Sequence, residues 1–172
     1  MALKTARNWV WTERTVASPV SVDDFRRFAT SHGWTTRAEA LGEGAVIDLS
    51  TGEWAIVDGA TYVRPLGARG PVASDDHPAT QVDLADAVAY CAARDARLPT
   101  EQEWEHAARN ARDDRGRYPW GDSAEGAPRA NVWQGSFPEA NTLADGFLFT
   151  SPIGTFPPTP LGFVDLVGNV WQ

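Results

Sequence analysis

The second half of the chain has almost no hydrophobic period, and this feature limits its fold more than any other. Residues 110–172 contain many Gly, Pro, Asn and Asp residues, with single aromatic residues between them. An irregular segment of this length is uncommon inside a compact domain unless something local orders it, such as a bound metal ion. The 15 Gly and 12 Pro among 172 residues agree with a chain rich in loops and turns. We therefore expect little regular secondary structure.

Helix signals are confined to the first 109 residues. Ser21 followed by Asp24 is typical of a helix N-terminus, and Gly33 is a plausible end for that helix. Phe25 and Phe28 lie at helical spacing between them. The first predicted helix therefore occupies the segment between Ser21 and Gly33.

Two more helices are predicted further along. Asp83 caps the second, whose apolar residues at helical spacing predict a buried stripe of Leu84, Ala87, Val88 and Cys91. Thr100 and Glu103 form a T-x-x-E capping box that opens the third helix. The inward face predicted for this third helix consists of Trp104, Ala107 and Ala108.

Short β-type runs lie between the first two helices. Residues 44–63 contain apolar runs broken by Thr51-Gly52 and Asp58-Gly59, a pattern that predicts a hairpin. Helices beside short strands and a long irregular region indicate an α+β fold.

Charge and cysteine content exclude several function classes. Fifteen basic and 23 acidic residues give a net charge of −8, which repels phosphate backbones and anionic lipids. Nucleic acid and membrane are therefore not expected as partners. Cys91, the single cysteine, can form neither an internal disulfide nor a thiolate cluster. Residues 1–16 mix charges with Trp, unlike a signal peptide, so we expect a cytoplasmic protein.

Local patterns predict no catalytic residue and no residue that binds an organic cofactor. His32, His77 and His106 lack the H-E-x-x-H spacing of a metal site, and ordinary surface positions are expected for them. The glutamates of residues 101–105 resemble paired catalytic carboxylates. However, Glu103 is explained by capping, and residues two apart on a helix do not face each other.

Four motifs carry a resemblance to a known family. They are R-L-P-T-E-Q-E-W-E-H-A-A-R (97–109), Y-P-W-G-D (118–122), N-V-W-Q-G-S-F-P-E-A-N-T-L-A-D-G-F (131–147) and G-F-V-D-L-V-G-N-V-W (162–171). Together they resemble the formylglycine-generating enzymes, also called sulfatase-modifying factors. The similarity extends upstream through residues 75–91 and, more weakly, residues 19–39.

The resemblance implies a fold, an activity and cofactors. The family fold is related to C-type lectins, has little regular structure and binds calcium. Its activity is the oxidation of a cysteine in a newly made sulfatase to formylglycine with molecular oxygen and copper(I). The implied partner is a sulfatase polypeptide.

The resemblance also predicts that this chain is incomplete. In the family, the active-site cysteine pair lies downstream of a G-N-V-W-E-W motif, whereas this chain stops at Gln172, and Cys91 matches a helix cysteine outside the pair. Copper(I) prefers thiolate ligands, so we expect no catalysis by this chain alone. We expect residues 1–16 to be an N-terminal extension and residues 17–172 to be a partial sulfatase-modifying-factor domain, shortened at both ends.

Other functions remain open. The chain could be a non-catalytic, C-type-lectin-like binding module or a gene fragment without function. It could also require a missing complementary segment as its partner.

One calcium site is implied by the resemblance in the segment 131–147. Its ligands would be the Asn131 side chain, the Val132 carbonyl, the Asp145 carboxylate and the Phe147 carbonyl. Calcium takes six to eight oxygen ligands, often backbone carbonyls, which suits irregular chain. The alternative is that Asn131 and Asp145 only cap turns.

A second implied calcium site lies at the end of the sequence. It would use the Asp165 side chain, the carbonyls of Gly168 and Val170, and the side chain of Gln172. The family has glutamate in place of Gln172, so a neutral amide would replace a bidentate carboxylate here. We therefore expect this site to be weaker than the first.

Overall fold

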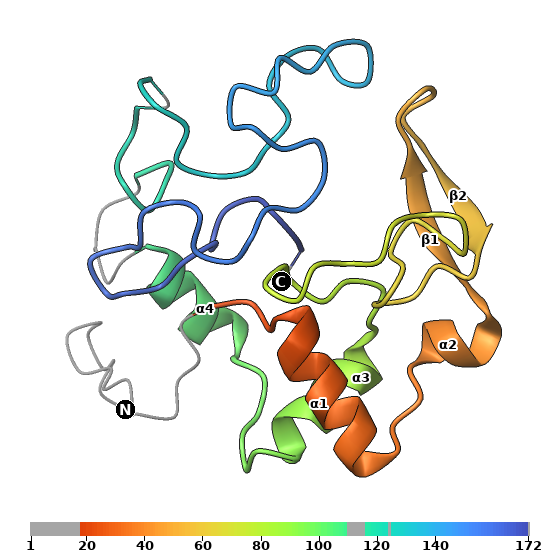
Figure 1. Cartoon of the computed structure of the whole chain (residues 1–172). Coiled ribbons are helices and arrows are strands. Elements are labelled where there is room, and N and C mark those ends of the chain that lie inside the picture. Colours follow the sequence, from red (N-terminus) through yellow and green to blue (C-terminus); the bar gives the residue numbers. More distant parts are fainter. Residues whose placement is uncertain (1–17, 110–115, 124, 172) are drawn as a thin grey trace.

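The computed structural model describes residues 18–109, 116–123 and 125–171 (Figure 1). The predicted N-terminal extension, residues 1–16, lies outside the described residues. Helices and strands follow one another in the order α1 (Val22–His32), α2 (Arg37–Leu41), β1 (Glu43–Asp48), β2 (Glu53–Asp58), α3 (Leu84–Ala92) and α4 (Glu101–Ala108). Helices and a small antiparallel sheet together are compatible with the predicted α+β class.

The three predicted helices begin and are capped as their sequences indicate. Ser21 accepts a hydrogen bond from the backbone N–H of Asp24 at the start of α1, and Gly33 ends that helix in the left-handed conformation. Capping boxes open α3, through Asp83, and α4, through Thr100. Side chains therefore satisfy backbone N–H groups that a helix start leaves free.

Helix α2 was not predicted. Thr36 and Glu39 form a third capping box, and Gly42 ends the helix in the left-handed conformation. The helix has only five residues and buries none of them, so it shows no hydrophobic period.

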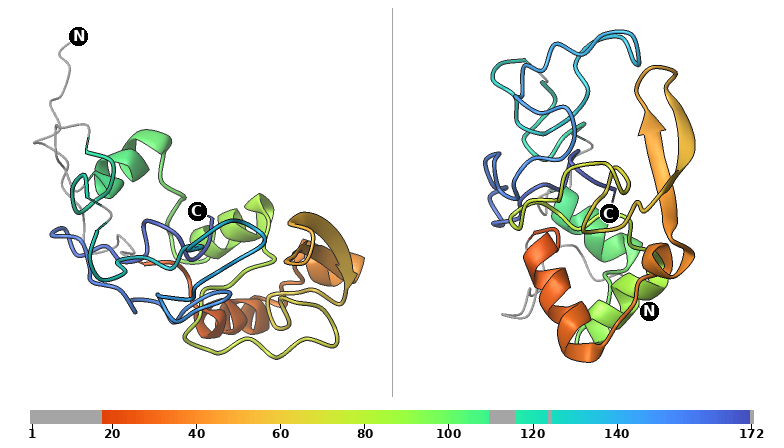
Figure 2. Two further views of the ribbon diagram at one scale, coloured as in Figure 1. Left: turned by 90° about the horizontal axis from the view of Figure 1, so that it is seen from above. Right: turned by 45° about the vertical axis from the view of Figure 1, so that its right-hand side comes forward.

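Strands β1 and β2 form the predicted hairpin, although they end at Asp58 rather than at residue 63. Their antiparallel register pairs Gly44 with Val57 and Ile47 with Trp54. The turn contains Gly52, whose φ of 75° is unfavourable for other residues. The hairpin and the loops of the second half both extend from the same side of α1 and α3 (Figure 2).

The main hydrophobic core lies between α1, α3 and the segment after β2. Phe25 is at its centre, with its ring 5.1 Å from that of Tyr62 and 5.8 Å from that of Tyr90. The buried members of the core are Val22, Phe25, Phe28, Ala29, Tyr62 and Tyr90. Aromatic pairs at these separations contribute beyond the area that they bury.

The buried stripe predicted for α3 was partly wrong, because Cys91 is half-buried against the core but other members of the stripe are exposed. Leu84 and Val88 are 72% and 50% exposed, whereas Asp86 and Tyr90 are buried. Asp86 faces inward because its carboxylate accepts hydrogen bonds from the backbone of Asp83 and from the indole N–H of Trp34, both at 2.9 Å. The predicted inward face of α4 agrees better, because Ala107 is buried.

Residues 116–123 and 125–171 contain no helix or strand, as predicted. Hydrogen bonds attach these loops to the helical half. The backbone N–H of Ile153 donates to the carbonyl of Asp76 at 2.9 Å, and the imidazole of His77 lies 2.8 Å from the hydroxyl of Thr150. Within the described ranges, every helix is too short or too polar to cross a bilayer.

Candidate functional site

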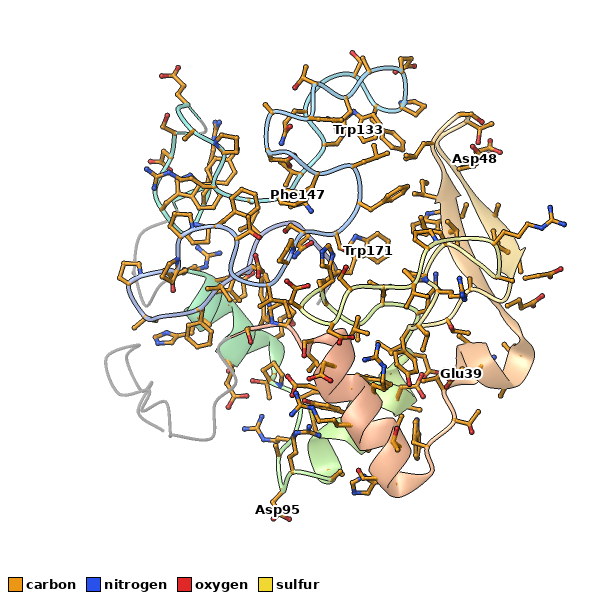
Figure 3. The ribbon with its side chains drawn as sticks, in the orientation of Figure 1. Glu39, Asp48, Asp95, Trp133, Phe147 and Trp171 are labelled. Carbon is orange, nitrogen blue, oxygen red and sulfur yellow. The ribbon has the colours of Figure 1, made fainter. Side chains whose placement is uncertain are left out.

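Three loop segments meet in the second half of the chain, and together they contain most of the predicted calcium ligands. We call this place the loop junction and define it as residues 131–132, 145–151 and 168–169. Hydrogen bonds, rather than a shared sheet, join the three segments. Phe147 marks the junction in Figure 3.

The carboxylate of Asp145 joins two of these segments. One oxygen accepts a hydrogen bond from the backbone N–H of Val132, and the other accepts one from the backbone N–H of Phe147, both at 3.0 Å. Among the residues that the structure describes, no Lys or Arg forms an ion pair with Asp145. A negative charge is therefore held in the loops by neutral donors.

Asn131 is buried and joins the first segment to the other two. Its side-chain N–H₂ group donates to the carbonyl of Phe149 at 2.6 Å and to the side-chain oxygen of Asn169 at 3.3 Å. Its own carbonyl accepts a hydrogen bond from the backbone N–H of Asn169 at 2.8 Å. Because its nitrogen is used in these bonds, its side-chain oxygen is the atom left to face a cation.

Gly168 allows the first and third segments to approach closely. A Cβ atom at this position would overlap the carbonyl oxygen of Asn131 and lie 2.8 Å from a methyl group of Val132. The φ of Gly168 is 73°, which also disfavours any other residue. Glycine is therefore required here both for space and for backbone conformation.

Ser151 is fully buried beside Asn169. The side chain of Asn169 accepts a hydrogen bond from the Ser151 N–H at 2.8 Å and donates one to the Ser151 carbonyl at 3.2 Å. The hydroxyl of Ser151 has no hydrogen-bond partner among the described residues. An unsatisfied buried hydroxyl is unusual, and water or an ion is a common explanation.

The structure thus brings the four predicted ligands of the first site together. Asn131 and Val132 are adjacent, and Asp145 contacts the backbones of Val132 and Phe147. Asn169 holds these loops together and was not among the predicted site residues. Its position directly after Gly168, which is itself a predicted ligand, was the available signal.

The predicted ligands of the second site are only partly described. The Asp165 carboxylate accepts a hydrogen bond from the backbone N–H of Gly154 at 2.8 Å. Burial raises the pKa of Asp165 above its ordinary value, and the hydrogen bond from Gly154 opposes this rise. The carbonyl of Gly168 accepts a hydrogen bond from the N–H of Val170 at 2.8 Å, and Gln172 lies outside the described residues.

The residues present do not fit a copper(I) centre. The chain has one cysteine, Cys91, which is half-buried on α3, and burial raises the pKa of its thiol. In the described ranges, no three His, Cys, Asp or Glu side chains cluster as metal ligands. A soft monovalent ion therefore has no set of thiolate ligands in this chain.

Comparison with known proteins identifies the family. Residues 15–172 match the family described as "Sulfatase-modifying factor enzyme 1-like domain". The match includes all the described helices, strands and loops. The chain belongs to the sulfatase-modifying-factor family.

Similar curated proteins carry the names of formylglycine-generating enzymes. The mouse formylglycine-generating enzyme is 38% identical over 91% of this chain and 46% of its own length. The Streptomyces coelicolor formylglycine-generating enzyme is 39% identical over 86% of this chain and 52% of its own. A bovine relative named "Inactive C-alpha-formylglycine-generating enzyme 2" is 39% identical over 90% of this chain and 56% of its own. The chain thus spans about half the length of these relatives.

Proposed function

We propose that this chain is part of a formylglycine-generating enzyme, which oxidises a cysteine of a sulfatase polypeptide to formylglycine with molecular oxygen and copper(I). One observation carries this proposal. The chain is 38% and 39% identical to the mouse and Streptomyces coelicolor formylglycine-generating enzymes over most of its length. The proposed fold is the family's C-type-lectin-like fold.

The 172 residues do not catalyse this reaction alone under our proposal. Copper(I) binds thiolates preferentially, and Cys91 is a single, half-buried thiol whose pKa is raised. One similar protein, from cattle, is named as an inactive formylglycine-generating enzyme, so similarity to this family does not by itself imply catalysis. A non-catalytic binding module therefore remains the second candidate.

The activity proposal is tested by completing the domain. The portion of the Streptomyces coelicolor enzyme that lies C-terminal to its match is fused after Gln172. The fusion is incubated with copper(I), air and a sulfatase-derived cysteine peptide, and aldehyde product is measured by mass spectrometry. We expect product from the fusion and none from the 172-residue chain or from the added portion alone. Product from the 172-residue chain would contradict the proposal, and no product from the fusion would favour the binding module.

We further propose that the loop junction binds calcium through Asn131, Val132, Asp145 and Phe147. Their donors are a carboxylate, a side-chain amide oxygen and backbone carbonyls, which are the oxygen ligands that calcium prefers. The charge of Asp145 has no ion-pair partner among the described residues, and calcium would supply the missing positive charge. Calcium would then hold together two segments that Asp145 already connects.

A weaker second calcium site is proposed at Asp165, Gly168, Val170 and Gln172. Asp165 is the only one of these residues with an anionic side chain. Burial of a carboxylate is unfavourable, and a bound cation would offset this cost.

Thermal melting with calcium or with a chelator tests both metal sites. A ligand that binds only the folded state raises the melting temperature by mass action. We expect calcium to stabilise the native chain and to stabilise the Asp145→Asn variant much less, with Asp165→Asn intermediate. Equal melting temperatures in calcium and in chelator would contradict the metal proposal without affecting the assignment to the family.

A further inference from the structure

One face of the hairpin is apolar and exposed. In an antiparallel pair, residues directly opposite each other lie on the same face. The register pairs Ile47 with Trp54 and Ala45 with Ile56, so these four residues share one face. Trp54 is 61% exposed and Ile56 is 66% exposed. A two-stranded sheet is marginal in water unless such a face packs on something.

Trp171 extends this face toward the loops. Its ring lies 6.0 Å from the ring of Trp54 in an edge-to-face arrangement, yet Trp171 is 92% exposed. Figure 3 shows Trp171 between the loops of the second half and the hairpin. The hairpin face and the end of the described chain therefore form one surface.

A hollow of about 270 Å³ adjoins Trp171. It is lined by Trp104, Leu166, Gly168, Val170 and Trp171. We define the hairpin–Trp171 surface as Ala45, Ile47, Trp54, Ile56, Trp171 and this hollow. An apolar face beside a hollow that can take an anchoring side chain is typical of a protein interface.

We infer that the hairpin–Trp171 surface binds the part of the sulfatase-modifying-factor domain that the relatives have outside their match to this chain. Matches cover 86–91% of this chain but only 46–56% of the mouse, Streptomyces coelicolor and bovine relatives. Under this inference, the unmatched part of such a relative belongs to the same domain and packs against the matched part, because the two share a core. The family match, residues 15–172, includes both the hairpin and Trp171.

The chemistry of the surface indicates what the bound segment presents. The two pairs at the centre of this face are apolar, whereas Glu43 and Asp58, opposite each other at the end of the strands away from the turn, are acidic and lie on the same face. The bound segment would therefore present apolar side chains to Trp54 and Ile56, and one of them would enter the hollow. This inference rests on membership of the family and not on the proposed oxidation or on calcium.

Hydroxyl-radical footprinting tests the inference residue by residue. The 172-residue chain is compared with the fusion that carries the C-terminal portion of the Streptomyces coelicolor enzyme. We expect oxidation of Trp54, Ile56 and Trp171 to fall roughly fourfold or more in the fusion, as for residues at the centre of an interface. Leu84 and Val88 on α3 serve as internal references, whose oxidation should not change.

A binding experiment adds a variant and a matched control. The same portion is added as a separate polypeptide to the native chain, to Trp54→Asp/Ile56→Asp and to Leu84→Asp/Val88→Asp. We expect the hairpin variant to bind at least ~10-fold more weakly and the α3 variant to bind as the native chain does. Circular dichroism of both variants verifies that they are folded.

Three outcomes would overturn the inference. In the first, Trp54 and Trp171 stay as reactive in the fusion as in the 172-residue chain. In the second, the α3 variant loses binding as much as the hairpin variant. In the third, the 172-residue chain forms a dimer and Trp54 becomes reactive only on dilution. This result would mean that a second copy of the chain covers the surface. None of these readouts depends on copper or on product formation.

Discussion

The side-chain amide of Asn169 pairs with both backbone polar groups of Ser151, at 2.8 Å and 3.2 Å. Because Ser151 is fully buried, these groups would lose their partners without Asn169. Glycine at position 169 removes the amide and tolerates the φ of 62° found there. We predict that Asn169→Gly lowers the free energy of unfolding by about 1–3 kcal/mol in urea denaturation. Leu143→Gly, at an exposed left-handed residue, is the control, and an equal loss in both variants would refute the prediction.

Replacement of Gly168 by alanine should be more harmful than the same change at Gly162. Both glycines have positive φ, which for alanine costs about 1–2 kcal/mol. Only at Gly168 would the new Cβ collide with the backbone of Asn131. We predict that Gly168→Ala loses at least ~1 kcal/mol more stability than Gly162→Ala. Chemical denaturation measures the difference, and similar losses would show that the loop junction moves apart easily.

Removal of the Ser151 hydroxyl should not destabilise the chain. The hydroxyl oxygen is buried and has no hydrogen-bond partner in the part of the chain that the structure describes, while the backbone of Ser151 keeps its bonds to Asn169. We predict that Ser151→Ala is neutral or stabilises by up to ~1 kcal/mol in urea unfolding. Ser31→Ala, which removes a hydroxyl that donates to the carbonyl of Phe28, is the comparison. A clear loss in Ser151→Ala would mean that the hydroxyl binds water or an ion in solution.

The ion pair between Arg97 and Glu103 should make stability depend on pH. Hydrogen bonds from the Arg97 guanidinium and the Thr100 backbone lower the pKa of Glu103 from 4.5 to about 2. A carboxyl group with a lowered pKa stabilises the folded state above its ordinary pKa and loses this contribution as pH falls toward the folded value. The melting-temperature difference between the native chain and Arg97→Gln should therefore be constant above about pH 5 and shrink between about pH 4.5 and pH 2.

Two measurements verify the origin of this pH dependence. NMR titration should show a higher pKa for Glu103 in Arg97→Gln than in the native chain. Arg109→Gln, which removes the exposed pair with Glu105, is the matched control and should leave the pKa of Glu103 unchanged. A pH profile of Arg97→Gln that is parallel to the native profile down to pH 2 would contradict the explanation.

The indole of Trp34 should stabilise the buried carboxylate of Asp86. Its N–H donates to Asp86 at 2.9 Å, and Phe cannot replace that donor. We predict a loss of about 1.5–3 kcal/mol for Trp34→Phe, the range for hydrogen bonds to charged groups. Trp120→Phe removes an indole hydrogen bond to the carbonyl of Ser123 in an exposed loop and should lose less. Thermal or urea unfolding of the two variants decides between these expectations.

Local sequence signals predicted the starts of the helices well, because capping depends on residues within one turn. Ser21, Asp83 and Thr100 all cap the helices expected of them. The same reasoning could have found α2, since Thr36 and Glu39 have the T-x-x-E spacing. A five-residue helix without a buried face offers no hydrophobic periodicity, so the capping spacing is its local signal.

Contacts between distant segments could not be predicted from the local pattern. In α3, the apolar residues Leu84 and Val88 were predicted to be buried. Asp86 and Tyr90 face inward instead, because Asp86 bonds to Trp34 and Tyr90 packs on Phe25. In the loops, the resemblance to a family grouped Asn131 with Asp145, and the structure joins Asp145 to Val132, the residue after Asn131. Asn169 bonds to Asn131, which lies 38 residues earlier in the chain, and no local spacing predicts such a contact.

The loop junction depends on asparagine side-chain amides, so chemical ageing of these amides limits how long the protein keeps its structure. Asn131 and Asn169 both donate through their side-chain nitrogen to backbone carbonyls. Hydrolysis of either amide to a carboxylate, a common ageing reaction of this thermolabile residue, would replace the donor with an acceptor facing another oxygen. Long storage or heating should therefore damage the irregular half of the molecule before the helical half.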